Sequence, residues 1–249
     1  MDTNQLLQRL RLLESAVVYD SPPPAGTMPF TYQPGTIPVL LSAPHGAAHR
    51  RNGRLKVEDE YTAAFVRLVA AETGSHVIYT RYQSDTDPNW DRQTPYKEQL
   101  RQIIREHQIA FVLDIHGMSN RHKIGLAVGT INGRSCPRHE SCIVRVLENG
   151  RFKQTTQDQA TLFPQLQADH FVLNHSRFTG GVKNHTVTRF VSQELNVPAA
   201  QLEFCSSLRV VEREWMEAGH KWPRLFQGDP NGIRHAVTTL ISLVDQLKQ

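Results

Sequence analysis

Two histidines that are each followed directly by glycine are the residues best suited to chemistry in this chain. His45-Gly46 comes after the apolar run 37–44, and His116-Gly117 ends a second apolar run. A glycine after the histidine allows the backbone and a ligand to approach closely. Histidine is the commonest metal ligand and a common general base, so the repeated pattern predicts a metal or catalytic site. A purely structural role, the usual one for a single histidine, is less consistent with two such dipeptides.

An acidic side chain is needed to complete a metal site of this kind. A catalytic zinc ion usually has three protein ligands and leaves a fourth position for water. The acids Glu58, Asp59 and Glu60 stand at the start of an expected helix. One of them can cap that helix or complement its dipole, while another reaches the metal. The spacing alone leaves the identity of the acidic ligand open.

Glu203 and Asp114 are candidates for roles next to the metal. Glu203 lies in the apolar run Leu202-Glu203-Phe204, where a buried carboxylate is costly unless it is paired or functional. Beside a metal-activated water, Glu203 is suited to take a proton and to deliver it to a leaving amine. Asp114 shares its strand face with His116, so it can orient that histidine. Alternatively, Glu203 points to solvent and Asp114 is a structural acid.

Substrate contacts are expected from two polar segments. Arg81 and Arg92 flank a loop that also holds Asn89. An arginine can bind a substrate carboxylate through two parallel hydrogen bonds, although a polar loop without a ligand has the same composition. Gly180 and Gly181 can bring backbone amides to a ligand, and a plain turn is the competing interpretation.

Strands that alternate with helices must position these side chains. The alternation predicts an α/β fold with a mostly parallel central sheet and helices on both faces, in which ligands bind beyond the carboxyl ends of the strands. Strands are expected at 37–44, 76–81, 110–117, 123–130 and 199–204. Helices are expected at 4–15, 59–72, 96–108, 157–173 (interrupted by Pro164) and 233–247. Residues 21–36, 45–58, 88–95 and 176–184 are expected to be loops.

The composition is that of a globular domain without a membrane span. The 249 residues are 39% hydrophobic and 21% charged, with a net charge of +4, which predicts a folded chain rather than a largely disordered one. We expect a single domain over 1–249, in which residues 1–36 form a helix and a proline-rich covering arm. The first residues lack the features of a signal peptide, which predicts a cytoplasmic protein. Three cysteines are too few for a disulfide framework, so reduced thiols are expected.

Six short motifs occur in order along the chain. They are PHG at 44–46, ED at 58–59, TRY with D-x-N at 81–89, DIHGM at 114–118, F-x-GG at 178–181 and QLEF at 201–204. Together they resemble the N-formylglutamate amidohydrolase family, a branch of the zinc carboxypeptidase and aspartoacylase group, over roughly residues 37–208. The resemblance implies a three-layer α/β/α fold with a mixed, mostly parallel sheet of the phosphorylase/hydrolase-like type.

The resemblance implies one zinc ion, or another divalent metal, bound by His45, His116 and an acid. Asp59 is favoured as the acid because Thr62 follows it at a spacing seen in several relatives. Glu58 is the alternative, since glutamate is the usual ligand in the carboxypeptidase group. Glu203 stands where the family has its catalytic glutamate.

The resemblance also assigns substrate-binding roles, to Arg81, Asn89, Gly180 and Gly181. The family commonly has arginine directly after that asparagine, whereas this chain has tryptophan there and the next arginine is Arg92.

Three functions follow as hypotheses. The first is a zinc-dependent amidohydrolase that cleaves a small N-acyl, N-formyl-like amino acid and takes an anionic amide as substrate. The second keeps the site but acts as a carboxypeptidase or peptide amidase on a short peptide. The third is a non-enzymatic binding module that uses the basic segments 49–56 and 120–123. We expect neither nucleic acid nor a membrane as partner, and the sequence leaves the oligomeric state open.

Overall fold

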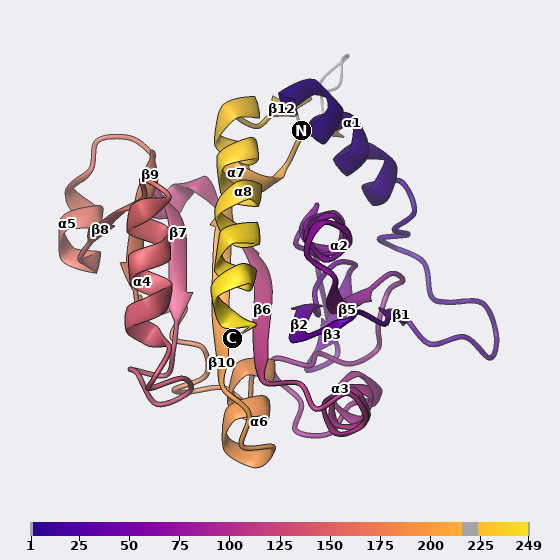
Figure 1. The fold of residues 1–249 in the computed structure, drawn as a ribbon. Coiled ribbons are helices and arrows are strands. Elements are labelled where there is room, and N and C mark those ends of the chain that lie inside the picture. Colours follow the sequence, from indigo (N-terminus) through magenta and orange to yellow (C-terminus); the bar gives the residue numbers. More distant parts are fainter. Residues whose placement is uncertain (1, 216–223, 249) are drawn as a thin grey trace.

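An eight-stranded sheet forms the centre of the computed structural model, which describes residues 2–215 and 224–248 (Figure 1). The strand order is β1-β5-β2-β6-β10-β7-β9-β8. Five of its pairings are parallel, and β1–β5 and β10–β7 are antiparallel. The strands are β1 (Phe30–Gln33), β2 (Ile37–Ala43), β5 (Ser75–Thr80), β6 (Phe111–Met118), β7 (Ile124–Gly129), β8 (Lys153–Thr155), β9 (Gln167–Leu173) and β10 (Ala199–Cys205).

Helices cover both faces of the sheet, which confirms the expected α/β class. One apolar cluster joins the sheet to α1 (Thr3–Glu14), α2 (Thr62–Thr73), α4 (Glu140–Asn149) and α8 (Pro230–Leu247). A second cluster joins the other face to α3 (Pro95–Glu106) and α6 (Val187–Glu194), which lie together in Figure 1. The alternation of side chains along each strand creates the two clusters, since Leu40 belongs to the second and Leu41 to the first.

The central strands are buried on both faces, as continuous apolar runs require. Because β2, β6 and β10 run parallel, their carboxyl ends meet at one edge of the sheet. Register fixes which residues are neighbours there: Ser42 is opposite Asp114, and Glu203 is opposite His116. The chemistry-bearing residues of three distant segments are therefore brought to one place.

Three expectations about secondary structure were wrong. The arm at 21–36 contains the edge strand β1, which pairs with β5 although prolines surround it. The loop at 45–58 contains a hairpin of β3 (His49–Arg51) and β4 (Arg54–Lys56) around Asn52-Gly53, two residues with positive φ. The segment 157–173 is a short helix, α5 (Gln157–Leu162), followed by β9, because Pro164 ends the helix and β9 pairs with β7 and β8.

One expected helix begins later than predicted, and several short elements have no counterpart in the sequence expectations. Helix α2 begins at Thr62 rather than at residue 59, so the acids before it lie outside its first turn. Among the described helices, none is long and apolar enough to cross a bilayer. The additional short elements are η1 (Asn120–His122), α7 (Ser206–Arg209), β11 (Glu212–Trp215) and β12 (Arg224–Gln227).

Candidate metal centre

His45, Asp59 and His116 lie together where β2 and β6 end. His45 is the second residue after β2, and His116 lies in β6 itself. The backbone N–H of Asp59 donates to the carbonyl oxygen of His45 at 2.7 Å, which holds the segment before α2 against the end of β2. This backbone hydrogen bond holds Asp59 next to His45, although the two residues are apart in the sequence.

The ligand atoms of these three residues converge. Asp59 Oδ2 lies 3.4 Å from His45 Nδ1 and 3.2 Å from His116 Nδ1. All three ligand atoms are within 4.8 Å of one another, and both histidines are buried. Glu58 does not belong to this group among the described residues. The geometry therefore favours Asp59 as the acidic member of the set.

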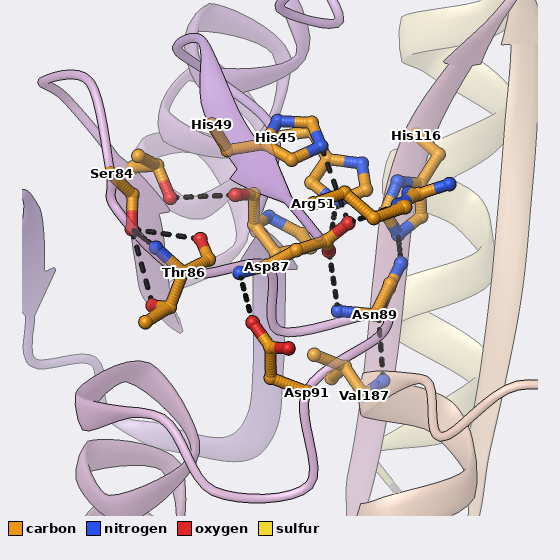
Figure 2. A network of polar contacts seen from close by, with 12 residues as sticks. His45, His49, Arg51, Ser84, Thr86, Asp87, Asn89, Asp91, His116 and Val187 are labelled. Atoms are coloured by element: carbon orange, nitrogen blue, oxygen red, sulfur yellow. Dashed lines mark hydrogen bonds and ion pairs between the residues drawn. The ribbon is translucent and has the colours of Figure 1, made fainter. Parts of the chain in front are cut away.

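The other nitrogen of each histidine faces a fully buried carboxylate. His45 Nε2 lies 2.9 Å from Asp87 Oδ1 (Figure 2). His116 Nε2 lies 3.1 Å from Asp114 Oδ2. A metal-binding histidine characteristically donates its second ring N–H to a carboxylate, which sets the ring orientation and tautomer. The two Nδ1 atoms are thus left for a ligand, so the residues present fit a divalent metal ion.

The acidic and the histidine side chains of this group favour each other's charged forms. Burial alone would raise the pKa of Asp59, but hydrogen bonds with His116 and His45 hold it well below the usual range. Burial lowers the pKa of His116, yet Asp114 and Asp59 raise it well above its ordinary value. Nearby carboxylates raise the pKa of both histidines, so protons compete with a metal for their ring nitrogens and binding is expected to weaken as pH falls.

Asp87 and His49 were not assigned any role from the sequence. They form a second group with His45 that has suitable donor atoms for a metal. However, Arg51 Nε already donates to Asp87 Oδ2 at 2.5 Å, and the Asn89 N–H donates to Asp87 Oδ1 at 2.8 Å. Because that carboxylate is neutralised and hydrogen-bonded, we assign Asp87 to orienting His45. The ring of His49 stacks on that of His45 with centroids 4.0 Å apart.

Glu203 lines a cleft that also exposes the ligand group. The cleft has a volume of about 430 Å³, and its lining includes His45, Asp59, His116 and Glu203. Glu203 is only 6% exposed, and burial raises its pKa to about 7. The Gln201 side chain donates to Glu203 Oε1 at 2.5 Å. The structure thus places a carboxyl group that is easily protonated next to the candidate ligands.

Asn89 lines the cleft, but both ends of its amide have protein partners. Asn89 Oδ1 accepts the Val187 N–H at 2.7 Å, and Asn89 Nδ2 lies 2.8 Å from His116 Nε2 (Figure 2). The first bond turns the Nδ2 donor toward the histidine, so Asn89 hydrogen-bonds Nε2 only when that nitrogen is unprotonated. When Nε2 donates its hydrogen to Asp114, Asn89 and His116 are in contact without a hydrogen bond. Its contacts suit the positioning of His116 better than direct substrate binding.

The two arginines expected to bind substrate lie elsewhere. Neither Arg81 nor Arg92 is among the described residues that line the cleft. Arg81 Nε donates to the carbonyl oxygen of Ala16 at 2.9 Å, because the chain after α1 packs against the end of β5. Arg92 is exposed. The cations among the described residues that line the cleft are Arg51, which belongs to the basic segment 49–56, and Arg177 and Lys183, which no motif indicated.

Gly180 and Gly181 line the cleft and are required by its packing. A Cβ atom on Gly180 would lie 2.6 Å from the carbonyl oxygen of Gly129 at the end of β7. Gly180 has φ +76° and Gly181 has φ +124°, a region that other residues rarely adopt. The expected turn therefore packs directly on the sheet and borders the cleft.

A larger cavity, of about 540 Å³, lies between α4 and α8. Arg145, Arg151 and His235 are part of its lining, and the described lining holds no carboxylate. Another cavity, of about 650 Å³ and lined by Lys153, Asp169 and Arg234 among others, is larger still, so volume does not single out the cleft. The convergence of buried ligand atoms selects the cleft instead.

Comparison with known proteins gives matches among solved structures only, since no protein-family model and no curated protein sequence matches the chain. N-formylglutamate amidohydrolase from Ralstonia eutropha JMP134 is similar with a TM-score of 0.48 and 14% identity, over 88% of this chain and 97% of its own. A bacteriophage poly-gamma-glutamate hydrolase has a TM-score of 0.47 and 12% identity, over 89% and 92%. A metallo-carboxypeptidase from Pseudomonas aeruginosa has a TM-score of 0.42 and 12% identity, over 98% and 68%. The first of these proteins bears the name of the family that the sequence motifs resemble.

Proposed function

We propose that this protein is a metal-dependent amidohydrolase that cleaves the amide of a small N-acyl amino acid. One observation supports this most strongly. Two histidine Nδ1 atoms and one carboxylate oxygen converge at a cleft, and each histidine has a buried carboxylate behind it. Two imidazoles and a carboxylate are a donor set that zinc uses in hydrolases.

His45, Asp59 and His116 would hold the ion, which we take to be Zn²⁺. Bound there, the ion supplies Lewis acidity that polarises a carbonyl and lowers the pKa of water toward about 7. Asp87 and Asp114 keep the two imidazoles in the orientation that presents Nδ1 to the cleft.

Glu203 moves the proton in this proposal. Burial raises the pKa of Glu203 to about 7 in the metal-free chain, so this carboxyl group binds a proton more readily than an exposed glutamate. It can therefore accept a proton from the attacking water and donate it to the leaving amine. Because Gln201 occupies Oε1, Glu203 Oε2 is the oxygen for this exchange.

The substrate is expected to carry a carboxylate. Arg177 and Lys183 are exposed and line the cleft, whereas its acids, Asp59 and Glu203, are more deeply placed. This arrangement puts positive charge at the mouth of the cleft and the reacting groups at its base. An N-acyl amino acid matches both, since its carboxylate can pair with the cations while its amide reaches Glu203.

Metal content tests the ligand assignment. We expect His45→Ala, His116→Ala and Asp59→Asn to lose bound metal in atomic emission measurements of purified protein. Glu58→Gln is the matched control and keeps it. Undiminished metal in both histidine variants would exclude this site.

A substrate panel tests the reaction itself. N-formyl and N-acetyl amino acids are compared with dipeptides, and turnover is measured before and after chelation. The proposal expects metal-dependent cleavage of the N-acyl amino acids. Cleavage of dipeptides alone would instead identify a peptidase.

A further inference from the structure

Lys97 is a buried lysine whose ammonium joins two segments that border the cleft. It is 2% exposed and is the third residue of α3. Its Nζ donates to the carbonyl oxygen of Asp91 at 2.6 Å, to that of His185 at 2.7 Å and to His185 Nδ1 at 2.7 Å. All three ammonium hydrogens are therefore used, each on a residue outside α3.

This is an unfavourable place for a lysine. The first turn of a helix carries positive partial charge, which repels a cation. Burial also disfavours the charged form and lowers the pKa of Lys97 to about 8. Neither the helix nor the burial favours this residue. Its three hydrogen bonds, together with nearby carboxylates and the ring of Phe190, account for its position.

The first segment that Lys97 holds is the turn 87–91. The Asp91 N–H donates to the carbonyl oxygen of Asp87 at 2.8 Å, and Asp91 Oδ2 accepts the Asp87 N–H at 2.9 Å. This turn carries Asp87, which orients His45, and Asn89, which contacts His116. A bond to the carbonyl oxygen of Asp91 therefore restrains the residues behind both histidines.

The second segment is 180–187, which lines the cleft with Gly180, Gly181 and Thr186. His185 Nε2 lies 2.5 Å from Glu194 Oε1, so the ring presents Nδ1 to Lys97 as an acceptor. Two residues later, the Val187 N–H donates to Asn89 Oδ1. Two sets of hydrogen bonds therefore connect the segments. One is the bond between Asn89 and Val187, and the other, which we call the Lys97 joint, consists of the bonds of Lys97 to Asp91 and His185.

We propose that Lys97 is a positioning residue that fastens the turn 87–91 to the segment 180–187 and thereby holds Asn89 against His116. Its effect on the metal rests on the proposed function, whereas its effect on the two segments does not. Among the described residues, loss of the Lys97 joint leaves the single Asn89–Val187 hydrogen bond to keep the amide next to the imidazole.

Lys97→Met tests this, because methionine keeps much of the side-chain volume and removes the donors. We expect hydrogen exchange at the buried Val187 amide to accelerate about tenfold or more relative to β10 amides, which report global stability. Metal affinity, measured by competition with a chelator, is expected to fall about 10- to 100-fold. Arg105→Met, on the exposed side of the same helix, is the matched control and changes neither.

A double-mutant cycle with Asn89→Ala shows whether Lys97 acts through that amide. The losses of metal affinity from Lys97→Met and Asn89→Ala are expected to be strongly non-additive. Additive losses, or faster Val187 exchange with unchanged metal affinity, would overturn the proposal. Unchanged Val187 exchange would do the same.

His185→Ala provides a second variant if Lys97→Met does not fold. It removes one acceptor of the ammonium, and we expect a smaller acceleration at Val187 without loss of global stability. An unaltered Val187 rate in this variant would also contradict the proposal. If the wild-type protein binds no metal, the proposed function fails, and the exchange measurements still test the Lys97 joint.

Discussion

Glu14, the last residue of α1, and Glu203, in the lining of the cleft, are buried glutamates whose pKa burial raises to about 7. Their surroundings differ. Glu14 Oε1 accepts hydrogen bonds from the Tyr19 hydroxyl and from the Tyr61 N–H just before α2. Glu203 faces the cleft and is paired across the sheet with His116.

The difference shows what a raised pKa does and does not indicate. In both regions, removal from water disfavours the carboxylate, so the shift reports burial. The carboxyl of Glu14 accepts the Tyr61 N–H just before α2, and Glu14 does not line the cleft. Glu203 combines the same shift with an open space and a set of ligand atoms. Only that combination suits proton transfer.

Glu203→Gln should show the largest difference in activity between the two buried glutamates. The amide cannot accept the proton, so we expect kcat to fall by about 10²- to 10⁴-fold while bound metal is retained. Glu14→Gln, the matched control, should leave kcat within about twofold. Full activity in Glu203→Gln would remove the proposed role of this residue.

The unfolding free energy of the wild type should depend on pH differently from that of the Glu14→Gln variant. The pKa of Glu14 is about 7 in the folded chain and about 4.5 in the unfolded chain. The stabilisation is therefore complete below about pH 4.5 and is lost as pH rises through 7. Relative to Glu14→Gln, the wild type should lose up to about 3 kcal/mol of unfolding free energy between pH 4.5 and 8. Urea denaturation at several pH values measures this, and parallel curves would contradict it.

Asp114→Asn should weaken metal binding without abolishing it. The amide still fills the space behind His116 but no longer accepts its N–H with a full charge. We expect a loss of about 10- to 100-fold in metal affinity, read by chelator competition. A loss as complete as that of His116→Ala would mean that Asp114 does more than orient the ring.

Tyr19→Phe should have the smallest effect, and only on stability. It removes the hydroxyl that donates to Glu14 and leaves the Tyr61 N–H as a donor. We expect a loss of about 1 kcal/mol in unfolding free energy at pH 5. Metal affinity should not change, and a large change would show that the two regions are coupled.

Much of the central sheet could be predicted because its strands are continuous apolar runs. The edge strand β1 could not, since its residues are only partly buried and its pairing with β5 has no local signature. The sequence of β9 was read as helix for a similar reason: its strand character depends on pairing with β7 and β8.

The sequence by itself determined which side chains stand at the ends of the central strands, and hence that His45, His116 and Glu203 meet. Tertiary structure decided the rest. It grouped Asp59 rather than Glu58 with the histidines, through a backbone bond to His45. It also placed Asp87 behind His45 and turned Arg81 toward Ala16. These choices depend on contacts between loops that are distant in the chain, and no local periodicity or spacing encodes them.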